Sequence, residues 1–131
     1  MSSEGNQAVV TKFLQEAFDR QNVDIVDEVF ASDHVLRSPE TGTEEVKGTK
    51  VIKRALEDYH NHEQGTGRFT IENQIAEGDW VATSYTLRDA QEEHMGVMFS
   101  RLDDSKIQET FVVARDVSGP GSDEGRRKHI N

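Results

Sequence analysis

The sequence of 131 residues contains no cysteine, which excludes disulfide bonds, thiolate chemistry and metal sites with cysteine ligands. No apolar run approaches the roughly 20 residues that a membrane-spanning helix requires. Aromatic residues make up only 7% of the chain and hydrophobic residues 34%, both low for a compact enzyme. A glycine-rich phosphate loop, a nucleophile elbow and a zinc motif are also missing. Several familiar catalytic classes are therefore excluded.

Basic residues are outnumbered by acidic ones, 15 to 25, which gives a formal net charge of −10 at pH 7. This charge disfavours nucleic acid and anionic membranes as partners, because both attract basic surfaces. The N-terminal segment MSSEGNQ lacks the basic and apolar parts of a signal peptide, so a cytoplasmic location is expected. The length suits one domain, expected over residues 1–117, and the aperiodic residues 118–131 are expected to be a disordered tail.

The N-terminal half has the apolar spacing of helices. Three helices are predicted, over residues 6–18, 23–30 and 49–62. One short strand is predicted between the second and the third helix, over residues 34–38. Residues 1–5 are expected to be a disordered lead. Asn22 is expected to cap the second helix, because its side chain can accept a hydrogen bond from a free backbone N–H.

After Gly67 the apolar spacing changes from helical to a period of two. Alternating segments follow one another with short polar connectors, over residues 69–75, 81–87, 94–102 and 106–116. Short connectors between such segments predict an antiparallel meander. Helices first and strands second indicate an α+β fold, a curved, mostly antiparallel sheet packed on the N-terminal helices. The resulting cone would have an apolar interior suited to a small molecule.

Four segments carry the pattern of one known family. They are Asp33–Pro39 (DHVLRSP), Ile75–Ala82 (IAEGDWVA), Gly96–Leu102 and Asp104–Phe111. In this order and spacing the chain, from about Asn6 to Asp116, resembles the SnoaL-like polyketide cyclase family of the nuclear transport factor two-like superfamily. The resemblance implies a cone-shaped α+β fold, often dimeric, with a pocket between helices and sheet. Relatives include cyclases, isomerase-like enzymes and hydroxylases, so the resemblance leaves the reaction open.

Three departures from the family pattern affect the expected site. Arg37 stands where the D-x-V-x-H-x-P motif has histidine. The hairpin over Leu87–Met95 is shortened, which removes part of the usual pocket wall. Arg115 occupies the place that best matches the acidic residue of the cyclases, with Asp116 next to it.

The last strand carries the first candidate catalytic groups. A period of two puts one set of side chains on a single face, and its apolar members predict that this face is inward: Ile107, Glu109, Phe111, Val113 and Arg115. Glu109 or Asp116 would then transfer protons, Arg115 would hold an enolate or carboxylate, and Phe111 would form apolar wall. The alternative is that Glu109 and Arg115 meet water or form a structural ion pair.

Other polar residues are candidates for the pocket wall. Arg37 is expected to bind an anion there or, alternatively, to pair with Glu109. His94 is a candidate acid or base, with an exposed histidine as the alternative. Tyr59 and Tyr85 are candidates for substrate contact, with ordinary core packing as the alternative.

Neither a metal nor a cofactor is expected. His60 and His62 do not share a helix face, so their spacing does not suit a metal site.

The hairpin IAEGDWVATSYTL places its two aromatic residues on opposite faces of the sheet. Tyr85 shares the parity of Val81 and is expected to point inward. Trp80 is then on the outer face beside small residues, and a tryptophan there predicts a homodimer in which two sheets pack together.

These observations predict a cofactor-independent, SnoaL-like enzyme that performs cyclisation or isomerisation by acid/base chemistry. Its substrate would be an apolar, carbonyl-bearing small molecule, for which a polyketide is one candidate. Two alternatives stay open: a non-catalytic ligand-binding or dimerisation module, and a hydroxylase-like homologue.

Overall fold

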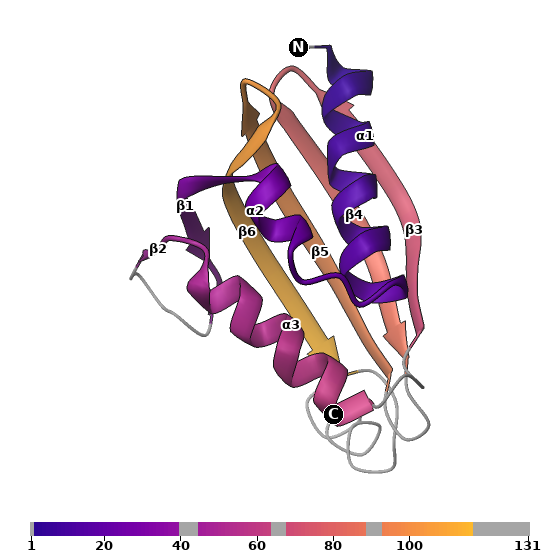
Figure 1. Ribbon diagram of the computed structural model, residues 1–131. Coiled ribbons are helices and arrows are strands. Elements are labelled where there is room, and N and C mark those ends of the chain that lie inside the picture. Colours follow the sequence, from indigo (N-terminus) through magenta and orange to yellow (C-terminus); the bar gives the residue numbers. More distant parts are fainter. Residues whose placement is uncertain (1, 40–44, 64–67, 89–92, 117–131) are drawn as a thin grey trace.

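A six-stranded sheet forms the body of the protein, and its helices lie on one face (Figure 1). The computed structural model describes residues 2–39, 45–63, 68–88 and 93–116. The elements are α1 (Ser3–Leu14), the π-helix η1 (Gln15–Asp19), α2 (Ile25–Val29), β1 (Phe30–Arg37), β2 (Val46–Lys47), α3 (Lys50–Glu63), β3 (Arg68–Glu77), β4 (Trp80–Arg88), β5 (Glu93–Asp103) and β6 (Lys106–Asp116). The predicted α+β class is confirmed. None of these helices is long and apolar enough to cross a membrane.

The strand order is β2-β1-β6-β5-β4-β3. Strands β3 to β6 form the antiparallel meander that the sequence predicts. The pairing of β1 with β6 is parallel and was not predicted. Local spacing could not reveal it, because most of the chain separates the two strands.

The first helix begins earlier than expected. Ser2 is its N-cap, and the serine side chain accepts a hydrogen bond of 3.0 Å from the backbone N–H of Gly5. The expectation that residues 1–5 are disordered is therefore wrong for Ser2 and the first turn of α1. The capping bond stabilises this turn because it satisfies one of the free N–H groups at the helix start.

The second helix is shorter than expected and has a different N-cap. It begins at Ile25, and Asp24 occupies the N-cap position without a side-chain capping bond. The predicted cap at Asn22 is wrong; the backbone carbonyl of Asn22, not its side chain, accepts a bond from the Ile25 N–H. The predicted tail, residues 118–131, lies outside the described residues.

Two β-bulges change which side chains face the helices. The register shift between Ile71 and Asn73 leaves Glu72 as an extra residue in β3, and a second shift leaves Gln108 extra in β6. Beyond an extra residue the alternation of faces reverses. Ile75, which shares the sequence parity of Phe69 and Ile71, therefore points outward and is 70% exposed.

The hydrophobic core lies between the helices and the inner face of the sheet. Helix α1 contributes Val10, Phe13 and Leu14, while β4 to β6 contribute Val81, Met98 and Ile107 among others. The His60 side chain of α3 donates a hydrogen bond of 2.7 Å to the Ala17 carbonyl. This bond joins α3 to the π-helix, so His60 has a structural contact.

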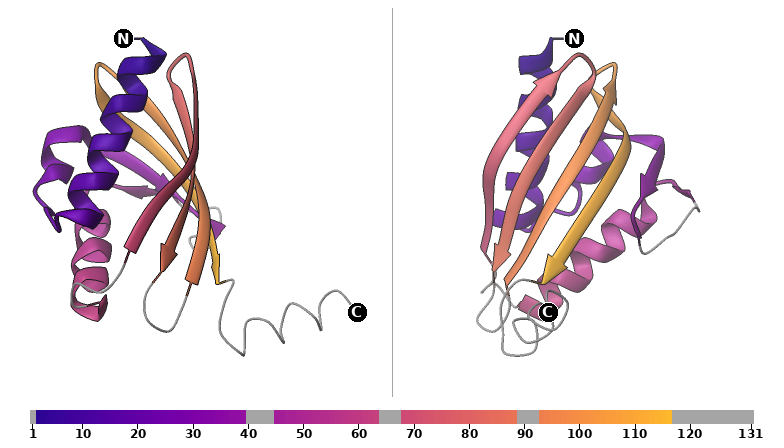
Figure 2. Two further views of the ribbon diagram at one scale, coloured as in Figure 1. Left: turned by 90° about the vertical axis from the view of Figure 1, so that its right-hand side faces the viewer. Right: turned by 180° about the vertical axis from the view of Figure 1, so that it is seen from behind.

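No helix of the described ranges covers the outer face of β3 to β6 (Figure 2, right). We call the following exposed side chains the outer apolar face: Ile75, Trp80, Met95, Val97, Phe99, Phe111 and Val113. Trp80 is 42% exposed there, whereas Tyr85 packs against the core. The prediction that Trp80 and Tyr85 point to opposite faces is confirmed.

Candidate functional site

A cavity of about 250 Å³ lies between the helices and the inner face of the sheet. It is lined by Phe13, Leu14, Phe18, Phe30, Leu36, Val51, Ile52, Ala55, Leu56, Tyr85, Met98, Thr110 and Val112. Among these residues only Tyr85 and Thr110 have a polar side-chain group. The lining of the inner cavity is therefore apolar except for these two hydroxyl-bearing residues.

Tyr85 reaches the inner cavity across Gly96. The two residues are paired in register on β4 and β5, and a Cβ atom at position 96 would lie only 2.4 Å from Cζ of the tyrosine ring. The absent side chain therefore allows the ring to cover the neighbouring strand. The ring also stacks on Phe69 at 5.0 Å between centroids, and Phe69 stacks on Phe18 at 4.4 Å. The stacked rings of Tyr85, Phe69 and Phe18 fix the position of the tyrosine beside the inner cavity.

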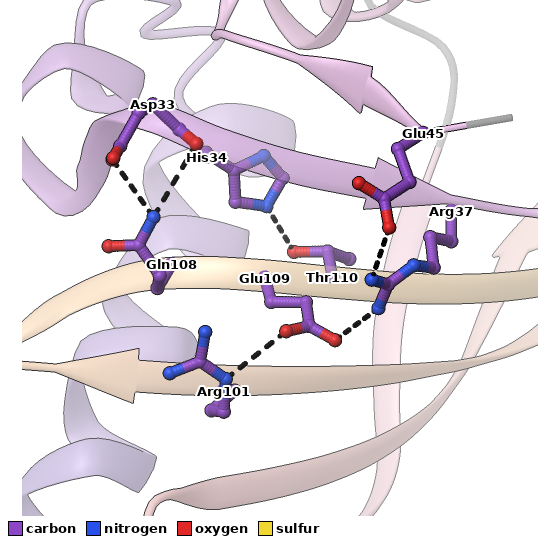
Figure 3. Close-up of polar contacts among 8 residues, drawn as sticks. All are labelled: Asp33, His34, Arg37, Glu45, Arg101, Gln108, Glu109 and Thr110. Atoms are coloured by element: carbon purple, nitrogen blue, oxygen red, sulfur yellow. Dashed lines mark hydrogen bonds and ion pairs between the residues drawn. The ribbon is translucent and has the colours of Figure 1, made fainter.

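A fully buried histidine lies behind the Thr110 hydroxyl. His34 has no exposed surface, and its Nε2 lies 2.8 Å from Thr110 Oγ1 (Figure 3). Burial lowers the pKa of His34 to about 4, although the charges of Glu109 and Asp33 act in the opposite direction. The imidazole is therefore neutral at pH 7.

Sequence reasoning did not single out His34 or Thr110. The available signal was parity, because His34 and Leu36 share one parity along β1, opposite to that of Val35 and Arg37. The expectation that Arg37 lies in the pocket wall is wrong. Leu36 is paired in register with inward-facing Thr110, so its neighbours along β1 point away from the cavity.

Glu109 lies on the outer side of the sheet, between two arginines. It accepts hydrogen bonds from Arg37 and, at 3.2 Å, from Arg101 Nε. Arg37 also donates to Glu45 at 2.8 Å, and this bond holds the pKa of the Glu45 carboxyl below its usual range (Figure 3). The predicted alternative, an Arg37–Glu109 ion pair, is therefore formed, but outside the cavity.

The inward orientation predicted for the last strand is wrong beyond its first residue. Ile107 is buried, but the extra residue Gln108 reverses the alternation that follows it. Glu109 consequently pairs with Arg101, and Phe111 and Val113 belong to the outer apolar face. Arg115 is also exposed on this side, so neither it nor Phe111 lines the inner cavity.

A hydrogen bond attaches the bulge to β1. The Gln108 amide donates to Asp33 Oδ1 at 2.9 Å, and this bond lowers the pKa of the Asp33 carboxyl (Figure 3). The bulge is thus held by a residue that lies 75 positions earlier in the sequence.

The remaining candidates lie near one end of the sheet. His94 is half-buried, shares the parity of inward-facing Gly96, and is paired in register with Asp116. Tyr59 packs edge-to-face on Phe18 at 5.2 Å. None of these three candidates is among the residues that line the inner cavity. The structure pairs His94 with Asp116 in register, whereas Glu109 is paired with Arg101 further along the same two strands.

In the part of the chain that the structure describes, no group of three histidine, aspartate or glutamate residues is arranged to hold a metal ion. The expectation that the protein needs no cofactor stays a prediction.

A curved sheet closed by helices around an interior cavity defines the nuclear transport factor two-like class of folds. Residues 10–110 match the model of the SnoaL-like domain, and the chain belongs to this family. No curated protein matches the sequence.

Solved structures with this fold come from several bacteria. A provisionally assigned ketosteroid isomerase from Kribbella flavida is 21% identical, with a TM-score of 0.73, covering 90% of this chain and 83% of its own. A provisionally assigned polyketide cyclase from Acidithiobacillus ferrooxidans is 17% identical, with a TM-score of 0.74 and coverages of 98% and 99%. A provisionally assigned hydroxylase from Streptomyces galilaeus is 16% identical, with a TM-score of 0.75 and coverages of 87% and 81%. At these identities the similarity establishes the fold alone.

Proposed function

We propose that this protein binds a small, apolar, carbonyl-bearing molecule in the inner cavity. The observation that carries the proposal is the lining itself, which is apolar except for the hydroxyls of Tyr85 and Thr110. Small-molecule sites typically combine such a lining with a few polar groups that orient the ligand. The volume of about 250 Å³ lies below the roughly 300–1,000 Å³ of pockets for drug-sized ligands, which favours a ligand of one or two rings.

The chemistry of the lining favours binding over catalysis. Its described residues include no carboxylate, guanidinium or imidazole. Burying about 200 Å² of apolar ligand surface would supply roughly 5 kcal/mol before the costs of association. An apolar ligand can therefore be held without a charged group, and the Thr110 side chain is a polar group that could select its orientation.

Filling the inner cavity is expected to remove this binding. Val112 lines the cavity, whereas its neighbour Val113 lies on the outer apolar face. We expect Val112→Phe and Val112→Trp to weaken binding of 2-acetylnaphthalene progressively, by about 10-fold or more for tryptophan, because the larger side chains occupy ligand volume. Isothermal titration calorimetry measures the affinity.

Val113→Trp is the matched control, because it adds the same side chain on the opposite face. Its affinity for 2-acetylnaphthalene should equal that of the unmodified protein. Unchanged affinity in a correctly folded Val112→Trp variant would show that the ligand does not occupy the inner cavity.

Acid/base chemistry is the second candidate function, and one observation favours it. His94 and Asp116 are paired in register at the end of β5 and β6. Because proton transfer by such groups contributes about 100-fold or more, the protein should accelerate α-proton exchange of 2-tetralone in D₂O. His94→Ala or Asp116→Asn should remove this acceleration, measured by proton NMR.

Glu109→Gln serves as the comparison variant, because Glu109 is held between two arginines away from the inner cavity. Exchange no faster than in buffer would exclude enolisation of this probe and leave the binding proposal standing. Loss of exchange in the Glu109 variant alone would instead support the catalytic role first predicted for that residue.

We also propose that the protein forms a homodimer through the outer apolar face. Seven large hydrophobic side chains are exposed together on strands that no described helix covers (Figure 2). Contiguous apolar surface of this kind is typical of interaction sites, whereas exposed hydrophobic residues elsewhere are usually scattered. A second copy presenting the same face would cover Trp80 and its neighbours.

A further inference from the structure

The Thr110 hydroxyl has one recorded hydrogen-bond partner, the buried imidazole of His34. The Oγ1–Nε2 distance is 2.8 Å, and within the described residues no second partner of this hydroxyl is found. Thr110 is also one of the residues that line the inner cavity. Whether it donates or accepts toward a ligand therefore depends on which nitrogen of His34 carries the hydrogen.

The surroundings of the other ring nitrogen distinguish the two tautomers. Nδ1 of His34 is buried, and no group in the described ranges forms a hydrogen bond with it. With the hydrogen on Nδ1, the protein would bury an unpaired N–H group. With the hydrogen on Nε2, it would bury only an unpaired acceptor, and orphaned N–H groups are the rarer of the two in native proteins. The burial pattern therefore favours the Nε2–H tautomer.

The tautomer determines the direction of the next hydrogen bond. When Nε2–H donates to Thr110 Oγ1, the threonine oxygen acts as acceptor and its own hydrogen is available for another group. The remaining lining is apolar apart from Tyr85, so a ligand is the available acceptor. A hydroxyl with an unused hydrogen in an apolar wall favours a ligand oxygen that cannot donate.

We propose that Thr110 donates a hydrogen bond to a carbonyl oxygen of the bound ligand, and that His34 is the positioning residue that makes Thr110 a donor. The inference rests on the proposed function and deepens it. It assigns the ligand to the class of small ketones or related carbonyl compounds, recognised at the Thr110 end of the inner cavity.

Two probes of equal shape test the donor. In 2-isopropenylnaphthalene a CH₂ group replaces the carbonyl oxygen of 2-acetylnaphthalene, so the pair differs mainly in the hydrogen-bond acceptor. Thr110→Val keeps the shape of the side chain and removes the hydroxyl. We expect this variant to weaken binding of the ketone about fivefold, the typical effect of one hydrogen bond, and to leave the hydrocarbon unchanged or tighter.

Ser100→Ala is the matched control. Ser100 is a buried residue paired in register with Thr110, its hydroxyl has no partner in the described part of the chain, and it does not line the inner cavity. Its removal should leave the ratio of the two affinities unchanged.

The tautomer of His34 is a second readout. The inference requires the Nε2–H tautomer, whereas a purely structural role for this histidine would not. Nitrogen-15 NMR of the imidazole at pH 7 should show a neutral ring protonated at Nε2. A ring protonated at Nδ1 would make Thr110 an acceptor toward the ligand and would overturn the inference. Equal effects of Thr110→Val on both probes would also overturn it while leaving the proposed function intact. Failure of both probes to bind the unmodified protein would overturn the proposed function and the inference together.

Discussion

Replacing Phe99 by glutamate is expected to convert a dimer of this protein into monomers, with a rise of about 100-fold or more in the dissociation constant. Phe99 lies within the outer apolar face, and its ring centroid is 6.5 Å from that of Phe111 on the neighbouring strand. A carboxylate at this position would have to lose its hydration when two sheets pack together, and no partner for it is near in the apolar set. Sedimentation equilibrium over a range of concentrations measures the change.

Trp80 provides an independent signal for the same event, because it is the only tryptophan of the chain. Dissociation should shift its fluorescence emission to the red as the indole becomes hydrated. Ala8→Glu, which adds the same charge on the exposed side of α1, is the control and should leave both association and emission unchanged. A red shift that is absent through a demonstrated dissociation would exclude Trp80 from the interface.

Lowering the pH from 7 to 5 is expected to cost about 2 kcal/mol of the free energy of unfolding, through His34 alone. The pKa of His34 is about 4 in the folded protein, against an ordinary value of 6.5. Between these values the unfolded chain binds a proton that the folded protein does not. The contribution of the neutral, buried ring is therefore complete above pH 6.5 and is lost as the pH falls toward 4. Urea denaturation at several pH values measures it.

His34→Gln removes the titrating group and is the comparison for this prediction. The difference in stability between the two proteins should change with pH between 7 and 5, and level off above about pH 7. The carboxyls of Asp33 and Glu45 have lowered pKa values, so their contributions are lost mainly at lower pH. Parallel stability curves for the two proteins over this range would show that His34 is not held neutral by burial.

Local patterns in the sequence were sufficient for the class of fold. Apolar residues at helical spacing predicted α3 within one residue at each end, and the period of two predicted β3 to β6. The segment IAEGDWVATSYTL also predicted the division between Trp80 and Tyr85, because the turn at Gly78 precedes an uninterrupted strand. Each of these features depends on near neighbours along the chain.

The composition of the candidate site could not be read in the same way. The orientation of Glu109, Phe111 and Arg115 depends on the bulge at Gln108, and a bulge is defined only against the partner strand. One extra residue moved these side chains from the expected cavity to the outer face. A regular strand would have continued on the inner face the series that begins at Ile107.

The sequence by itself determined the α+β class, the family and the two-sided character of the sheet, because periodicity and short motifs are local properties. Only the tertiary structure decided which residues meet at the inner cavity. His34 and Thr110 lie on β1 and β6, far apart in sequence, and the parallel pairing of these strands brings them within 2.8 Å. That pairing forms only when the whole sheet assembles. The burial that makes His34 neutral and directs the Thr110 hydroxyl depends on the same assembly.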